Sequence, residues 1–199
     1  VRNEWAWQGK PRSLVALNAE TGALLWKQRD AVIPLTLTAA NGGVFYHDGT
    51  SIIRRSSSTG DVVWKSAPVS RMGSIPICFG PTLVVYDDVV LFAGGDGKMY
   101  GICRETGKNK WPAPAVHHRG GHNSPRDLLV VGGLAWSGQI AGGRMDGLFS
   151  GCDPATGEVK KSFTPNVDTY WFHHRCYRSK ATDRYVLPSR TGIEFVDWK

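Results

Sequence analysis

The sequence has no long apolar run, no closely spaced cysteine pair and no block of like charges, and each absence excludes a class of protein. A membrane-spanning helix needs about 18 consecutive apolar residues, so no transmembrane segment is expected. The four cysteines, Cys78, Cys103, Cys152 and Cys176, form no CxxC pair, which leaves zinc-finger and thioredoxin-like sites without support. The absence of a charge block and of any nucleic-acid motif predicts no nucleic-acid partner.

Catalytic signatures are missing as well. We find no Ser-His-Asp order, no P-loop and no GxGxxG before a helix, because Gly94, Gly95 and Gly97 fall in an expected hairpin. The chain opens on Val1 with no Met and no apolar leader, so we expect a processed or excised piece of a longer protein. The net charge of +7 favours anionic partners: a carboxylated or phosphorylated small molecule, a polyanion or a membrane surface.

One phrase recurs along the chain. Each copy has an alternating run, a Thr-Gly pair and a second short run, and the copies span 14–26, 51–64, 99–111 and 148–161. The repeat glycines are 38, 47 and 50 residues apart, at Gly22, Gly60, Gly107 and Gly157. A period of this length, carrying strands and turns, is typical of a β-propeller.

We therefore predict an all-β fold, a β-propeller of four-stranded antiparallel blades that forms an arc of a seven- or eight-bladed ring. The whole of 1–199 is one propeller segment. It has a partial first blade over 4–28, blades at about 35–65, 82–112 and 127–163, and a partial last blade over 173–199. In the third blade we expect strands over 82–86, 89–93, 99–103 and 109–111.

The repeated Thr-Gly predicts a tight hairpin. Glycine takes the positive φ that such a turn needs, and the threonine hydroxyl can bond to the turn backbone. Trp26, Trp64 and Trp111 each come four residues after the repeat glycine, on the expected outermost strand. We interpret these tryptophans as blade-docking residues that cover the hairpin of the next blade. The fourth copy has Lys161 instead, with Phe163 as a substitute two residues later.

The phrase LVALNAETGALLW resembles the repeat of the pyrroloquinoline-quinone (PQQ)-like propellers. That superfamily includes quinoprotein alcohol and sugar dehydrogenases and non-catalytic members, such as a lipoprotein that helps to assemble outer-membrane barrels. The resemblance implies a bacterial repeat protein in a periplasmic or otherwise extracytoplasmic location. It also implies PQQ with calcium as a cofactor in the enzymes. Those enzymes commonly hold the quinone against a disulfide of adjacent cysteines, which this chain lacks, and no catalytic residue can be carried over.

Three connections between blades are longer than a propeller needs, at 66–80, 112–127 and 164–184. Each joins an outer strand to the next inner strand, so we expect all three on one face of the ring, around its axis. This face is basic and rich in histidine and arginine. Its candidate ligand-binding residues are Arg71, His117, His118, Arg119, His122, His173, His174 and Arg175.

Three interpretations of these residues stay open. They are solvated loop residues, or an anion site in which guanidinium groups grip carboxylates, or a transition-metal site. A metal would take one histidine of each adjacent pair, giving a set such as His118, His122, His174 and Cys176. The rings at 170–172 beside the second His-His-Arg either stack a planar ligand or pack under the loop.

The sequence leads to three hypotheses about function. The first hypothesis is a non-catalytic binding or scaffold module whose basic face takes an anionic ligand or a protein partner. The second is part of a PQQ-dependent oxidoreductase, such as an alcohol or sugar dehydrogenase. The third is a His/Cys transition-metal site on the same face.

Overall fold

The structure is a computed structural model that describes residues 11–33, 35–73, 81–116, 127–139, 148–164, 180–187 and 195–197. All the regular elements in these ranges are strands, and all strand pairs are antiparallel. This confirms the expected all-β fold. No helix in the described part of the chain is long and apolar enough to cross a membrane.

The strands form five sheets in chain order. The first sheet is a hairpin of β1 (Pro11–Leu17) and β2 (Leu24–Ala31). The second contains β3 (Thr38–Ala40), β4 (Gly43–His47), β5 (Ser51–Ser56) and β6 (Val62–Pro68). The third contains β7 (Thr82–Tyr86), β8 (Val89–Ala93), β9 (Lys98–Cys103) and β10 (Ala115–Val116).

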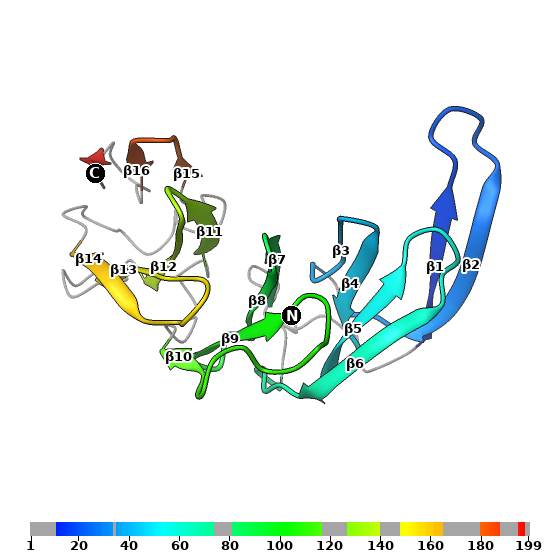
Figure 1. Cartoon of the computed structure of the whole chain (residues 1–199), viewed down its shortest axis with the longest axis horizontal. Helices are drawn as coiled ribbons and strands as arrows, with labels where there is room; N and C mark the ends of the chain where they lie inside the picture. Colours follow the sequence, from blue (N-terminus) through cyan, green and yellow to red (C-terminus); the bar gives the residue numbers. More distant parts are fainter. Residues whose placement is uncertain are drawn as a thin grey trace, which may run out of the picture.

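The fourth sheet contains β11 (Asp127–Val131), β12 (Leu134–Gln139), β13 (Leu148–Cys152) and β14 (Val159–Phe163). The fifth contains β15 (Lys180–Ala181), β16 (Tyr185–Leu187) and β17 (Val196–Asp197). Figure 1 shows the sheets following one another in an open arc, with the inner strands β3, β7 and β11 on the concave side. The contacts of β7 with both β3 and β11 agree with this arrangement.

The Thr-Gly turns have the expected conformation. The four repeat glycines have φ between 71° and 78°, which confirms the left-handed geometry. Each threonine hydroxyl accepts a bond from the amide two residues later, as in Asp61 N to Thr59 Oγ1 at 3.3 Å. The phrase therefore closes the same hairpin in the first four sheets.

The fourth strand of the third sheet differs from the prediction. We expected it over 109–111, but Asn109 makes only an isolated bridge to Ile102, and the strand is β10, paired with Met99 and Lys98. Pro112 and Pro114 explain the difference, because neither has an N–H to donate and the ladder cannot continue through them. The chain leaves the sheet at this point and returns at Ala115.

Apolar side chains fill the junctions between successive sheets. Phe45, Ile52 and Trp64 of the second sheet pack against Phe92 and its neighbours in the third. A second cluster joins the third sheet to the fourth through Leu91, Trp111, Leu128 and Cys152. The core is thus a series of inter-sheet layers, which is how propeller blades are held side by side.

Each of the three repeat tryptophans lies over the repeat glycine of the following sheet. The contacts are Trp26 on Gly60, Trp64 on Gly107 and Trp111 on Gly157. At the position of the missing fourth tryptophan, Lys161 lies on an exposed stretch of β14. Phe163 instead packs with Trp136 and Phe149 of its own sheet, at ring distances of 6.0 and 5.5 Å.

Candidate functional site

Arg71 is the one candidate ligand-binding residue that the described residues include. It lies three residues after the end of β6, on the connection that leads to the third sheet. The other candidates lie outside the described residues: His117, His118, Arg119, His122, His173, His174, Arg175 and the fourth metal candidate, Cys176. Arg71 and the side chains that hold its segment form the described part of the candidate site.

The segment after β6 meets the turn between β8 and β9. The Met72 amide donates to the Gly94 carbonyl oxygen at 3.1 Å. The two segments approach so closely that a Cβ on Gly94 would lie 2.4 Å from the Ser70 carbonyl oxygen. Only glycine fits there, so the turn and the connection form one continuous surface, which we call the loop face (residues 69–73 and 94–97).

A network of hydroxyl groups fixes Ser70. Its Oγ donates to Asp96 Oδ2 in a short hydrogen bond, and the Tyr100 hydroxyl lies 2.6 Å from the same Oγ. Since the single Ser70 hydroxyl proton goes to the carboxylate, the tyrosine hydroxyl donates to Ser70 Oγ. The tyrosine oxygen in turn accepts from the Ser70 amide at 3.2 Å. These bonds hold the residue before Arg71 in one position.

His47 is buried beneath the loop face and contacts its backbone. Its ring is fully buried and stacks on Phe92 at 4.7 Å. Nδ1 accepts from the Gly49 amide at 2.9 Å, so the proton is on Nε2, which faces the Val69 carbonyl oxygen at 3.3 Å. Burial, reinforced by the positive charge of Arg71, lowers the pKa of His47 to about 4. At neutral pH the imidazole of His47 is therefore uncharged. It bonds to the backbone and is unsuited to holding an anion.

Arg71 supplies the positive charge of the loop face. Its Nη1 donates to the carbonyl oxygen of Met72 at 2.6 Å, which curls the guanidinium against its own segment. Partial burial lowers the pKa of Arg71, yet guanidinium stays charged at any physiological pH. A half-buried, positioned guanidinium recognises carboxylates better than a fully solvated one, because less conformational entropy is lost on binding.

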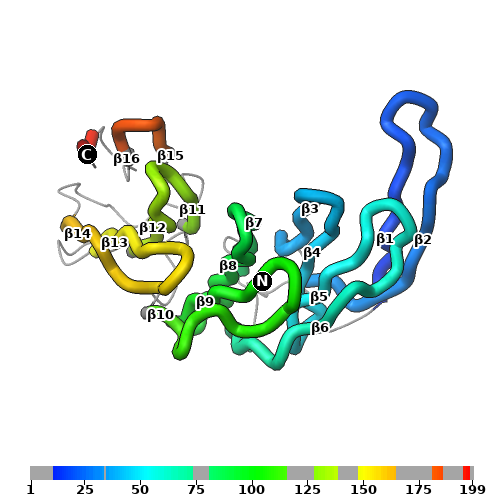
Figure 2. The backbone as a smooth tube through the Cα atoms, in the orientation of Figure 1, coloured from blue at the N-terminus to red at the C-terminus, as the bar shows by residue number. Residues whose placement is uncertain are grey.

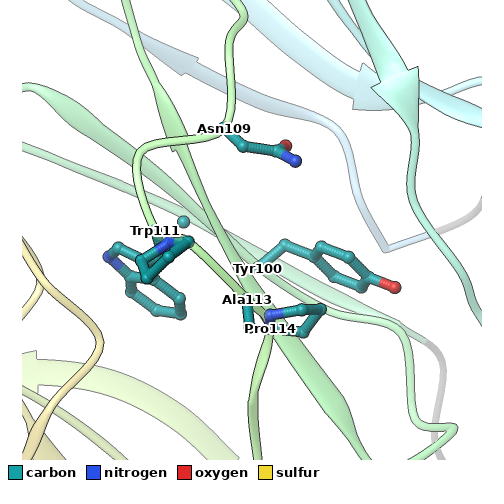
Figure 3. Close-up of a pocket in the computed structure, with 7 residues that line it drawn as sticks. Tyr100, Asn109, Trp111, Ala113 and Pro114 are labelled. Carbon is teal, nitrogen blue, oxygen red and sulfur yellow. The ribbon is translucent and has the colours of Figure 1, made fainter.

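A small pocket lies behind Tyr100, at the break in the outer strand of the third sheet. Figure 3 shows the Tyr100 and Trp111 rings on opposite sides of it, with Asn109 above and Pro114 below. Its volume of about 90 Å³ is well under the several hundred Å³ typical of small-molecule sites. This pocket is a by-product of the proline break and cannot hold a large planar cofactor.

The sulfur chemistry of the described residues is limited. Cys103 and Cys152 are free thiols in different sheets. Burial raises the pKa of Cys152 to about 11, so its thiol is inert, whereas a hydrogen bond from the Thr106 side chain lowers the pKa of Cys103. The part of the chain that the structure describes has no group of three or more His, Cys, Asp or Glu side chains that could hold a metal.

Sequence reasoning missed a charged cluster between the first two sheets. Arg55 donates to Asp30 at 2.9 Å and to the Tyr46 hydroxyl at 2.8 Å, and that hydroxyl donates to Asp30. Burial opposes ionisation of Asp30, but the bonds from Tyr46 and Arg55 leave its pKa below the ordinary value. Burial and the adjacent carboxylate raise the pKa of Tyr46. The cluster joins sheets and is structural.

Comparison with known proteins identifies a family that agrees with the arc of antiparallel sheets. The family described as "Outer membrane protein assembly factor BamB" matches residues 3–141. The chain belongs to this PQQ-like repeat family. Among curated proteins of the family, the quinoprotein ethanol dehydrogenase of Pseudomonas aeruginosa is 28% identical over 140 residues, covering 60% of this chain and 22% of that protein. The chain thus spans about a fifth of the length of this PQQ-like relative.

Solved structures show the same fold at low identity. BamB from Moraxella catarrhalis is 21% identical with a TM-score of 0.58, covering 92% of this chain and 56% of that one. A europium-containing methanol dehydrogenase is 17% identical with a TM-score of 0.60, covering 94% and 47%. The computationally designed Ika4 protein is 15% identical with a TM-score of 0.58, covering 92% and 95%. These likenesses establish the PQQ-like propeller fold alone.

Proposed function

We propose that this chain is a non-catalytic binding or scaffold part of a PQQ-like propeller, and that its loop face recognises carboxylates. The carboxylates belong either to a small anionic ligand or to an acidic surface of a protein partner. The ring in which it works has seven or eight blades, and the described sheets form an arc of it.

The positioned cation of the loop face carries this proposal. Ser70 is tied to Asp96 and Tyr100, and Met72 is tied to Gly94, so Arg71 is held between two fixed residues. The fixed guanidinium fork and the net charge of +7 both favour a carboxylate ligand. The His-His-Arg residues of the other two connections extend the same basic face in this proposal.

The description of the matched family supports the proposed protein partner and the proposed location. A family named for outer membrane protein assembly favours a protein partner and a periplasmic or otherwise extracytoplasmic place of work.

A titration with PQQ, a tricarboxylate, tests the proposal. The purified protein is titrated by calorimetry with PQQ in the absence of calcium, and saturable binding is expected. Arg71→Gln should weaken binding about ten-fold, the effect of losing a charged hydrogen bond. Lys108→Gln is the matched control, because it removes one charge at the opposite end of the same sheet, beside the Thr106-Gly107 turn. Equal binding by both variants contradicts the proposal.

The second candidate function is a PQQ-dependent oxidoreductase. The likeness to a quinoprotein ethanol dehydrogenase favours it. In this case the protein with PQQ and calcium reduces an artificial dye when ethanol is added. Binding of PQQ without ethanol-dependent dye reduction supports the scaffold function, and sustained dye reduction replaces it with the enzyme.

A further inference from the structure

The outer edge of β2 is open. β2 is the outermost strand of the first sheet, and among the described strands it pairs with β1 alone. It has eight residues, more than any other strand in the described ranges. Figure 2 shows β2 on the outside of the arc, with β1 on its inner side. A strand edge of this length offers backbone N–H and C=O groups to a further strand.

Two exposed apolar residues begin this strand. Leu24 and Leu25 are 60% and 54% exposed. The residues at the same positions of β6, Val62 and Val63, are each 52% exposed. β6 belongs to the second sheet, which packs against a sheet on either side. Exposure at these two positions is therefore a property of the outer strands and does not arise from the end of the arc.

The outer strands of the third and fourth sheets lack this apolar pair. In the third sheet, Pro112 and Pro114 interrupt the outer strand. In the fourth, Lys160 takes the place of the second apolar residue. Proline and lysine at a sheet edge both oppose the addition of a further strand. The open apolar edges thus belong to the first two sheets of the arc.

β2 differs from β6 in its charge. Its exposed face has Leu25, Lys27 and Arg29 at every second position. Neither of these cations makes an ion pair with a described residue. On β6 the single cation, Lys65, is neutralised by Asp48 at 2.7 Å. The β2 edge therefore has an unbalanced positive charge beside an apolar residue.

This charge decides which strand can pair with the edge. Side chains directly opposed on neighbouring strands attract when their charges are opposite and repel when they are alike. Two copies of β2 paired about a twofold axis would bring Lys27 and Arg29 of one copy against those of the other. An acidic strand would instead give each cation a partner.

We propose that the outer edge of β2 binds an extended acidic segment of a protein partner, which adds as an antiparallel strand. The segment has acidic side chains opposite Lys27 and Arg29 and an apolar side chain opposite Leu25, at every second position. Backbone bonds supply affinity, and the side-chain pairs supply specificity. This surface is separate from the loop face, so the proposal does not depend on the function of Arg71.

An NMR titration of the full chain with a synthetic peptide tests the proposal. The peptide has seven residues, with glutamate at its second and fourth positions, leucine at the sixth and threonine elsewhere. Saturable shifts of the β2 backbone amides are expected. Lys27→Glu combined with Arg29→Glu should weaken binding about ten-fold or more. The same variant should bind a peptide that has lysine in place of both glutamates, because the charges are again opposite.

Two controls separate strand pairing from general charge attraction. Lys160→Glu combined with Lys161→Glu also removes two cations from an outer strand and should bind the peptide like the original chain. Two further peptides carry N-methyl groups at either the even or the odd positions. One should lose binding and the other keep it, since alternate N–H groups of a strand face opposite edges.

The proposal fails if the β2 amides do not shift at millimolar peptide. Equal weakening by the Lys160 and Lys161 variant, or equal binding of the two N-methyl peptides, would reduce the interaction to unspecific charge attraction. Loss of binding in Arg71→Gln would move the peptide to the loop face. Shifts of the β2 amides that grow with protein concentration in the absence of peptide would assign the edge to a second copy.

Discussion

The indole of Trp64 lies against Gly107 of the next sheet, so closely that a Cβ on the glycine would be 2.7 Å from the ring. The indole Nε1 also donates to the Arg104 carbonyl oxygen of the same turn at 2.9 Å. The same pair of contacts joins Trp26 to the turn at Gly60 and Trp111 to the turn at Gly157. The repeat therefore encodes a junction as well as a hairpin.

Removing one of these indoles should be costly. Trp64→Ala is expected to lower the free energy of unfolding by about 3–5 kcal/mol, the usual cost of a large aromatic lost from a core. Denaturation in urea, monitored by circular dichroism, measures the change. Val62→Ala in the same strand is the control, because Val62 is 52% exposed and should cost much less. Similar losses for the two variants would show that the junction does not depend on the indole.

Two glycine substitutions separate backbone strain from the inter-sheet contact. Gly22 and Gly60 have nearly the same φ, +71° and +77°, but a Cβ meets nothing within 4 Å at Gly22 and lies 2.8 Å from Trp26 at Gly60. Gly22→Ala should cost about 1–2 kcal/mol, the strain of a left-handed residue. Gly60→Ala should cost clearly more, because it also displaces the indole. Equal melting temperatures for the two variants would contradict the contact.

Burial of His47 predicts a pH dependence of stability. Its pKa is about 4 in the folded protein and 6.5 when unfolded, so the unfolded chain binds the proton first as pH falls. The stabilisation is complete above pH 6.5 and is lost on acidification toward pH 4, up to about 3 kcal/mol. His47→Asn should remove this slope in urea titrations at stepped pH. A slope that persists in the variant assigns the effect to other groups.

The Asp30 carboxylate should contribute through its two partners. Asp30→Asn leaves Arg55 with a weaker acceptor in a half-buried site, so a loss of about 2 kcal/mol is expected. A double-mutant cycle with Arg55→Met measures the coupling by chemical denaturation. A coupling near zero would show that the pair is screened by solvent and that apolar packing alone joins the first two sheets.

The periodic features of this fold could be predicted from the sequence, and the long-range ones could not. Alternating runs and Thr-Gly pairs are local patterns, so they predicted the sheets and the positive φ of Gly60 and its equivalents. The prediction of a strand at 109–111 was wrong, because it followed the repeat pattern and not the prolines that come after it, which interrupt strand pairing.

The site shows the same limit. Asp96 lies within the hairpin expected around Gly94, Gly95 and Gly97, and no local pattern joins it to its partner Ser70, which is 26 residues earlier. No local pattern singles out His47, because its contacts with Val69 and Phe92 exist only after two sheets have packed. The roles of His118 and His174 stay predictions.

The most direct test of the carboxylate-binding face is a hydrogen-exchange footprint of the protein with and without PQQ. We expect PQQ to slow exchange in residues 69–73 and 94–98, around Arg71, and to leave the turn at 104–107 unchanged. Protection of the 104–107 turn instead, or no protection at a PQQ concentration that saturates binding, would contradict the account.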